Sequence, residues 1–372
     1  MATPRDPIMT SWVQQQLNDP QLRIEPLAGD ASFRRYARIY TQSLDSAQSQ
    51  AQDQSQANTF MLMDAPPDKE DSQPFIEIAN WLDQHQVRVP HIIAKDLQQG
   101  FILLEDFGDT LLSQVLTPET VDQYYQQAMD QLLQLQAIPV NDTPLPPYSH
   151  DKLMQEMSLF DDWFIRQYLK INLTAAEQKM LTDTYTLLAN TALAQPQVVV
   201  HRDYHSRNLM LLSQQNTLGI IDFQDAVIGA YTYDLISILR DAYVQWSPAQ
   251  VKQWMQYFWQ HLPASQTTDK TLTDFAREFD FMAAQRHLKV LGIFIRLNLR
   301  DGKTGYMKDL PLVLHYLYQE THDYPELAAF NSFLQQRIVP AFVQQQPESR
   351  ALFNDGLDEG LEVTAQIKSA PQ

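Results

Sequence analysis

The stretch VVVHRDYHSRNLMLLSQQNTLGIIDFQDA, residues 198–226, decides the fold. It contains three short apolar segments whose length and composition predict buried strands. They are VVVH (198–201), LMLL (209–212) and LGIID (218–222). Polar side chains follow them, with Asp203 and Asn208 after the first segment and Asp222 at the end of the third. The strands would hold these three side-chain oxygens on rigid elements.

The spacing of these polar residues predicts a phosphoryl-transfer site. Asp203 follows His201 and Arg202, and four residues separate it from Asn208, which is the H-R-D-x-x-x-x-N spacing of kinase catalytic loops. Asn208 and Asp222 offer the oxygen ligands that Mg²⁺ prefers. Asp203 is the candidate base for an attacking hydroxyl, a role worth about 10²–10⁴ in rate. Single Asp and Asn residues between strands are commonly turn formers, but the joint spacing favours a functional site.

The flanking sequence predicts an α+β chain of two lobes. Strands are expected at 23–28, 33–40, 59–65, 91–97 and 100–108, with helices at 11–17 and 75–85. Helices are expected at 118–138, 151–170, 174–194, 233–245, 248–261, 272–299 and 310–319. We therefore expect a strand-rich, nucleotide-binding N-terminal lobe (1–104). A mostly helical C-terminal lobe (105–372) would carry the catalytic loop and the substrate site, with a ligand cleft between the lobes.

Composition excludes several classes of function. The 372 residues include 27 basic and 45 acidic ones, a net charge of −18, which argues against binding to nucleic acid or an anionic membrane. The absence of cysteine excludes disulfides and thiolate metal sites. The sequence has no apolar run of about 18 residues and no secretory h-region at its start. We expect a cytoplasmic protein that acts as a monomer on a small molecule.

The segments HRDYHSRNLMLL (201–212) and LGIIDFQDAVIGAYTYDLISIL (218–239) resemble the aminoglycoside phosphotransferase and choline kinase family. That family favours a second histidine in the loop, here His205, and replaces the third residue of D-F-G, here Gln224. The residues that match its D-x-x-x-G-x-x-x-x-D-L pattern are Asp225, Gly229, Asp234 and Leu235. The resemblance implies a bilobal protein-kinase-like fold, ATP as phosphate donor, and a structural Asp234 that hydrogen-bonds the catalytic loop.

Further segments are similar to the bacterial anomeric kinases of N-acetylmuramate and N-acetylglucosamine. They are GDASFRRYARIY (29–40), FMLMDAPPDKED (60–71), GFILLEDFGD (100–109) and RLNLRDGKTGYMKDLP (296–311). This resemblance implies phosphorylation of the C1 hydroxyl of an amino sugar during cell-wall recycling, with the sugar 1-phosphate passing to a uridylyltransferase. Two alternatives stay open: a kinase of another small-molecule hydroxyl, such as an aminoglycoside or choline, and a catalytically inactive kinase-fold binding module.

The nucleotide site implied by the family departs from its pattern at one point. The third strand, residues 59–65, lacks the lysine that kinases use to hold the phosphates, which is the best support for an inactive module. Arg34, Arg35 or Lys69 could supply the cation, and Arg35 is our candidate because side chains alternate across a strand that faces the cleft. Ser32, in the turn that would cover the phosphates, is also expected to contact the nucleotide.

Two further contacts are expected from position. The backbone of Leu103, Leu104, Glu105 and Asp106 resembles the hinge that bonds to the adenine edge. His205 and Arg207, inside the catalytic loop, are expected to contact the acceptor sugar. Arg286, Lys289, Arg296 and Arg300 share one face of the helix at 272–299, within an arc of about 80°. Such a basic stripe could attract an anionic substrate, with Arg300 as a sugar contact, or could neutralise local acids.

Overall fold

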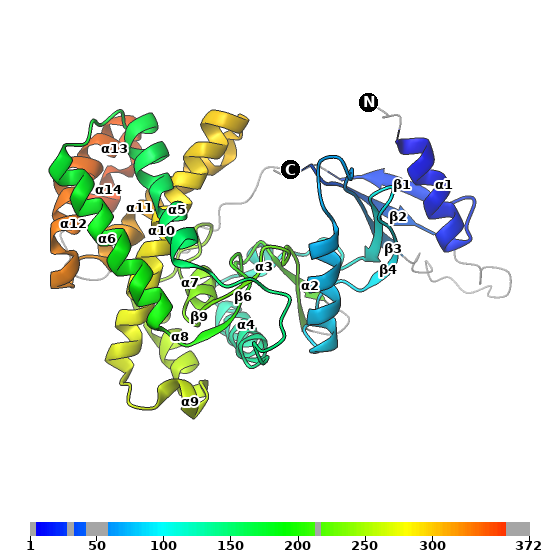
Figure 1. The fold of residues 1–372 in the computed structure, drawn as a ribbon, viewed down its shortest axis with the longest axis horizontal. Coiled ribbons are helices and arrows are strands. Elements are labelled where there is room, and N and C mark those ends of the chain that lie inside the picture. The colour runs from blue at the N-terminus through cyan, green and yellow to red at the C-terminus, as the bar shows by residue number, and fades with distance from the viewer. Residues whose placement is uncertain (1–4, 28–32, 42–58, 213–216, 355–372) are drawn as a thin grey trace. The chain divides into compact units, whose positions relative to one another are not determined.

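The structure is a computed structural model that describes residues 5–27, 33–41, 59–212 and 217–354. The chain divides into two compact units (Figure 1). The first comprises Met1–Thr110 with Met210–Gln224, and the second comprises Leu111–Leu209 with Asp225–Gln372. The first unit is rich in strands and the second is mostly helical, as predicted.

An antiparallel sheet of five strands forms the frame of the first unit, as far as the structure describes it. Its strands are β1 (Arg23–Pro26), β2 (Arg35–Tyr40), β3 (Thr59–Asp64), β4 (Ile92–Asp96) and β5 (Phe101–Glu105). They lie in the order β1-β2-β3-β5-β4, so β5 is an inner strand. All five coincide with predicted strands and are slightly shorter than expected.

Side chains of β2 alternate between the two faces of the sheet. One face is covered by helix α1 (Asp6–Leu17), and the buried cluster there contains Met9, Val13, Ala37, Ile39, Leu62, Phe101 and Leu103. Because Ala37 and Ile39 lie on this face, Tyr36 and Arg38 lie on the other. Helix α2 (Gln73–Gln84) follows β3 and confirms the helix predicted at 75–85; its buried side chains include Phe75, Ile78 and Leu82.

Strands β7 (Leu209–Leu212) and β8 (Thr217–Ile220) also pack with the first unit. The amide of Leu211 donates to the carbonyl of Thr110, and that of Ile220 to the carbonyl of Arg88, both at 2.8 Å. Gly219 lies against the ring of Phe107, where an added Cβ would come within 2.3 Å of the ring. That residues 1–104 bind the nucleotide and residues 105–372 carry the catalytic loop and substrate site stays a prediction. These predicted bounds do not include the return of Met210–Gln224 to the first unit.

Helix α10 (Leu272–Asp301) is central to the second unit. It begins after Thr271, whose hydroxyl accepts a hydrogen bond from the amide of Asp274, and it ends at Gly302, whose φ of 69° suits glycine. Every residue from Phe281 to Lys289 is buried, so other elements surround the middle of this helix. The helix predicted at 272–299 is confirmed.

The remaining long helices also match predictions. They are α4 (Val121–Gln136), α5 (His150–Leu159), α6 (Ala175–Ala194), α8 (Pro248–His261) and α11 (Leu310–Glu320). The helix predicted at 151–170 changes after α5 into a π-helical segment, Phe160–Tyr168. The shorter elements are α3 (Leu112–Val115), β6 (Gln197–Val200), β9 (Val227–Ala230), α7 (Tyr233–Leu239), α9 (Ala264–Thr267), α12 (Ala328–Phe333), α13 (Val339–Gln345) and α14 (Ala351–Asn354). Within the described ranges, no helix is long and apolar enough to cross a membrane.

The close approach of α10 to α5 makes Gly292 sensitive to substitution. A Cβ at this position would lie 2.4 Å from the carbonyl carbon of Leu159 and 2.5 Å from its oxygen, and backbone cannot swing aside as a side chain can. We expect Gly292→Ala to destabilise the protein by about 1–3 kcal/mol, measured by denaturant unfolding. Gly305→Ala is the control, because nothing lies within 4 Å of its added Cβ. Equal stability of both variants would contradict this packing.

Candidate active site

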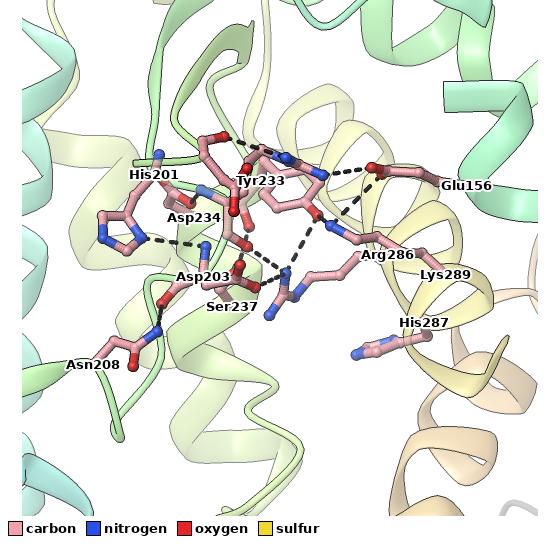
Figure 2. A network of polar contacts seen from close by, with 12 residues as sticks. Glu156, His201, Asp203, Asn208, Tyr233, Asp234, Ser237, Arg286, His287 and Lys289 are labelled. Carbon is pink, nitrogen blue, oxygen red and sulfur yellow. Dashed lines mark hydrogen bonds and ion pairs between the residues drawn. The ribbon is translucent and has the colours of Figure 1, made fainter. Parts of the chain in front are cut away.

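The catalytic loop starts where β6 ends, and a buried carboxylate holds its backbone. The amides of His201 and Arg202 donate to the two carboxylate oxygens of Asp234 at 2.6 and 3.0 Å (Figure 2). Arg202 has a φ of 76°, a left-handed conformation that is costly for a residue other than glycine. Both bonds fix this strained turn, so the predicted hydrogen bonding of Asp234 to the loop is confirmed.

A second carboxylate anchors the middle of the loop. Asp241 accepts hydrogen bonds from the amide and the hydroxyl of Ser206, at 2.9 and 2.5 Å. The helix predicted at 233–245 is too long, since α7 ends at Leu239 and Arg240 has φ −121° and ψ 52°. The early end frees Asp241 from helical geometry, which lets it reach Ser206. Local sequence periodicity carries no information on that contact.

Within the loop, the backbone around Asp203 is bonded while its side chain remains accessible. The Asp203 amide donates to Nδ1 of His201 at 3.2 Å, and its carbonyl accepts from the amide of His205 at 2.9 Å. The same carbonyl accepts from the side-chain nitrogen of Asn208 at 3.0 Å (Figure 2). The Asp203 side chain is 39% exposed. Its carboxylate therefore sits on a fixed backbone and can meet a ligand.

Two cations of α10, Arg286 and Lys289, stabilise this carboxylate. Nη1 of Arg286 lies 3.9 Å from Oδ1 of Asp203 and also donates to the carbonyl of Arg202 at 2.6 Å. Desolvation by itself would raise the pKa of Asp203, but Lys289 and Arg286, together with His205 and His201, outweigh it. The pKa of Asp203 is held well below its ordinary value of 3.8. Asp203 is therefore an anion throughout the physiological pH range.

A buried ion-pair network supports those cations. Nζ of Lys289 donates to the hydroxyl of Tyr233 at 3.1 Å and lies 3.6 Å from Oε2 of Glu156 (Figure 2). Glu156 also pairs with the guanidinium of Arg202, and is 5% exposed. Glu156 thus links α5, the catalytic loop and α10. The sequence does not single out Glu156, and the basic stripe indicates Arg286 and Lys289 without indicating that they lie beside Asp203.

Lys289 offers a test of this electrostatic environment. Removing its charge in Lys289→Met weakens the stabilisation of the Asp203 anion, so the pKa of Asp203 rises towards the working range. We expect the acidic limb of the kcat–pH profile to move to higher pH in this variant. Lys152→Met is the matched control, because Lys152 lies 3.9 Å from the same Glu156 but belongs to the exposed side of α5. If the acidic limb of the kcat–pH profile lies at the same pH in both variants, Lys289 does not lower the pKa of Asp203.

The predicted acceptor contacts divide into two groups. His205 and Arg207 converge on Tyr243: the His205 ring meets it edge-on at 5.2 Å, and the Arg207 guanidinium lies 3.6 Å from its ring centroid. Arg300 is exposed and pairs with its neighbour Asp301 at 2.8 Å. It lies fourteen positions after Arg286 on the helix, about 21 Å further along the axis. The structure thus brings the side chains of His205 and Arg207 together on Tyr243 and leaves Arg300 at the far end of α10.

The predicted metal ligands have donor chemistry that fits Mg²⁺. The nitrogen of the Asn208 amide bonds to the carbonyl of Asp203, so its oxygen is the end directed away from that carbonyl (Figure 2). Asp222 is exposed and adopts a φ of 66°, and its Oδ1 accepts a hydrogen bond from Nε2 of Gln224 at 2.7 Å. Amide and carboxylate oxygens are the hard ligands that this cation takes.

Ser32 and Arg35 are the side chains predicted to contact the nucleotide. Ser32 lies outside the described residues. Arg35 faces α1, where its guanidinium bonds to Asp64 of β3 and lies 3.1 Å from Oδ1 of Asp6. This arginine is therefore engaged on the face of the sheet that α1 covers. Its predicted role at the nucleotide remains a prediction, to which the geometry lends no support.

The predicted hinge lies on and after the inner strand β5. Leu103 and Leu104 are buried within the sheet. The Glu105 amide already donates to the carbonyl of His91 at 2.9 Å, and the Asp106 carboxylate bonds to Nε of Arg38 at 2.6 Å. Adenine recognition by this backbone stays a prediction, and it would have to use groups other than the Glu105 amide.

Comparison with known proteins agrees with this geometry. The model of the phosphotransferase enzyme family (APH) matches residues 23–266, which include the catalytic loop and Asp222. The chain is similar to the N-acetylmuramate/N-acetylglucosamine kinase of Pseudomonas putida, with 37% identity over 337 residues, 88% of this chain and 94% of that protein. It is also 39% identical over 323 residues to the protein of that name from Pseudomonas aeruginosa, covering 85% of this chain and 88% of that one.

A solved structure confirms the fold. The ethanolamine kinase of Plasmodium vivax matches with a TM-score of 0.58 and 11% identity, covering 82% of this chain and 86% of that chain. At so low an identity the likeness concerns the fold alone, and it confirms the predicted kinase-like α+β fold. From the family match and the two bacterial relatives together, the chain belongs to the phosphotransferase enzyme family.

Proposed function

We propose that the protein is an ATP-dependent kinase of the anomeric C1 hydroxyl of N-acetylmuramate and N-acetylglucosamine, and that it works in the cytoplasm as a monomer in cell-wall sugar recycling. The names of the bacterial relatives support the choice of acceptor. The observation that carries the chemistry is the accessible Asp203 carboxylate, kept ionised by Lys289 and Arg286 on a backbone fixed by Asp234. An anion fixed in this way is what orienting a hydroxyl requires.

In the proposed reaction, Asp203 accepts a hydrogen bond from the C1 hydroxyl and aims its oxygen at the γ-phosphorus of ATP. The new C1–O–P bond forms as the bond from that phosphorus to the bridging oxygen of ADP breaks, and the proton passes to Asp203. Because the pKa of Asp203 is low, it is a weak base and takes this proton late. Catalysis then depends mainly on positioning and charge stabilisation, as in other phosphoryl transfers.

Asn208 and Asp222 are the residues that would hold Mg²⁺. The bound cation would neutralise phosphate charge, as it does in kinases generally. Asn208 contributes in a second way, because its amide nitrogen bonds to the Asp203 carbonyl and so couples the metal ligand to the base. The backbone at Leu103–Asp106 would bind the adenine edge, with the Glu105 amide excluded by its bond to His91.

The side of the loop that carries His205 and Arg207 would receive the sugar. The ring of Tyr243 contacts both side chains. Two more aromatic rings follow it: the centroid of Phe294 lies 6.4 Å from that of Tyr243, and the centroid of Tyr306 lies 4.9 Å from that of Phe294. Arg207 could bind the lactyl carboxylate of N-acetylmuramate. Cations beside Asp203 and in this loop disfavour a positively charged acceptor such as an aminoglycoside or choline.

The test is ³¹P NMR of the products formed from ATP, Mg²⁺ and each candidate acceptor. N-acetylmuramate and N-acetylglucosamine should each give a sugar 1-phosphate, whose phosphorus couples to the anomeric proton. With choline or an aminoglycoside, ADP should form no faster than by hydrolysis of ATP without an added acceptor. Transfer to either of these instead, or to another sugar carbon, would overturn the proposed acceptor. ATP binding without transfer to any acceptor would favour an inactive binding module.

A further inference from the structure

Two adjacent arginines at the start of β2 lie on opposite faces of the sheet. Arg35 is paired in the β2–β3 register with Asp64 and bonds to it on the face that α1 covers. Arg34, one residue earlier, is 8% exposed and its guanidinium lies 5.6 Å from the ring of Phe75 in α2. Neighbouring residues of a strand point to opposite sides. Arg34 therefore belongs to the same face as Tyr36.

The carboxylate of Glu70 helps to hold Arg34 on this face. Its Nη2 lies 2.8 Å from Oε1 of Glu70, and its Nε donates to the same oxygen at 3.1 Å. Glu70 precedes α2, and its side chain is 22% exposed. Glu77 of α2 is exposed and accepts a hydrogen bond from Gln73 of its own helix.

Asp222 lies near the same face of the sheet, because its neighbour Phe223 packs against Phe75. Phe75, the ring beside Arg34, stacks on Phe223 with centroids 5.0 Å apart, and Phe223 directly follows Asp222. Tyr36 lies within electrostatic reach of both Arg34 and Asp222, and its hydroxyl contacts the sulfur of Met63 at 3.4 Å. A buried guanidinium and the proposed metal ligand thus lie around one pair of aromatic side chains, all within the first unit.

On β3 this face carries no cation. Met61 and Met63 point to it, because they are the register partners of Arg38 and Tyr36. We propose that Arg34 takes over the role of the absent strand lysine and binds the phosphates of the nucleotide whose Mg²⁺ Asp222 holds, with Glu70 as its orienting partner. This rests on the proposed function. A guanidinium suits the role, because its planar fork bonds phosphate oxygens in pairs and stays charged.

The test compares nucleotide affinities of purified full-length variants by calorimetry, with ATP and adenosine as ligands in the presence of Mg²⁺. Arg34→Met should weaken ATP binding by about 10- to 100-fold, the usual range for charge-assisted hydrogen bonds. It should leave adenosine binding within about threefold, since adenosine has no phosphates. Arg34→Lys should restore part of the loss, because it returns the charge without the fork.

Two further variants separate phosphate binding from a structural ion pair. Arg35→Met should lower the melting temperature through the loss of its bonds to Asp64, with the ratio of ATP to adenosine affinity unchanged. Glu70→Gln keeps the charge of Arg34 but weakens the ion pair that orients it, so ATP affinity should fall by less than in Arg34→Met while adenosine affinity stays unchanged. If the pair were only structural, Arg34→Met and Glu70→Gln would weaken both ligands alike.

The outcomes are distinct for the two proposals. If the wild-type protein binds no ATP, the proposed function fails and the role of Arg34 fails with it. If the wild type binds ATP and phosphorylates the sugar while Arg34→Met binds ATP equally well, only the assignment of Arg34 is overturned. A selective loss of ATP affinity in Arg35→Met would move the role to Arg35.

Discussion

Replacing Asp203 with Asn is expected to lower kcat by at least about 10²–10⁴, the usual contribution of a positioned base. The amide keeps the size of the side chain but removes the negative charge and the ability to take a proton. The backbone bonds of the loop do not involve this side chain, so the fold should persist. The measurement is steady-state turnover of ATP with N-acetylmuramate, alongside ATP affinity by calorimetry.

ATP affinity should stay close to the wild-type value in Asp203→Asn, since the proposed phosphate ligands are other residues. Asp151→Asn is the control for the loss of one negative charge, because this carboxylate is fully exposed on α5 and should leave kcat unchanged. Turnover of Asp203→Asn near the wild-type rate would show that the base has been misassigned. An equal loss of ATP affinity would instead indicate that Asp203 acts on the nucleotide.

Asp234→Asn is expected to damage both stability and turnover. The carboxylate accepts from two backbone amides, and it is fully buried. An amide has one oxygen, so its nitrogen would face one of those N–H groups and leave it unsatisfied, at a cost of about 1–3 kcal/mol. The strained turn at Arg202 would then relax. Because a shift of about 1 Å can cost about 10² in rate, we expect a loss of that order in kcat.

Thermal unfolding and kcat should be measured together for Asp234→Asn. Ser237→Ala provides the control on the same helix, because this buried hydroxyl bonds only locally, to the carbonyl of Tyr233 at 3.0 Å, within the contacts that the structure describes. That variant should change both quantities little. If Asp234→Asn retains wild-type turnover and melting temperature, the loop does not depend on this carboxylate for its shape.

Most of the secondary structure was predictable, since the period of apolar residues reflects burial directly. Helix α10 is a clear case: its apolar periodicity, the cap at Thr271 and the glycine at 302 agree on its limits. Helix α7 is the instructive exception. Its apolar pattern continues towards residue 245, but the helix ends at Leu239, and Asp241, just beyond that end, bonds to Ser206 of the catalytic loop. The local sequence pattern carries no signal for this contact with the catalytic loop.

The sequence predicts the oxygen-bearing residues of the candidate site, but it does not predict the charged side chains that surround Asp203. The spacing of Asp203, Asn208 and Asp222 marks the oxygens because these residues are close in sequence. Glu156 and Lys289 come from distant helices, and no local pattern links them to the loop. The depressed pKa of Asp203 depends on them, since desolvation by itself would have raised it.

By itself, the sequence determined the catalytic motif, the order of strands and helices, and the fact that Arg34 and Arg35 must point in opposite directions. Strand alternation fixes that opposition because it is a property of the backbone. Only the tertiary structure decided which arginine faces which side, because α1 covers one face of the sheet and α2 approaches the other. Electrostatic and packing energies depend on distances between segments far apart in the chain, and those distances exist only in the folded protein.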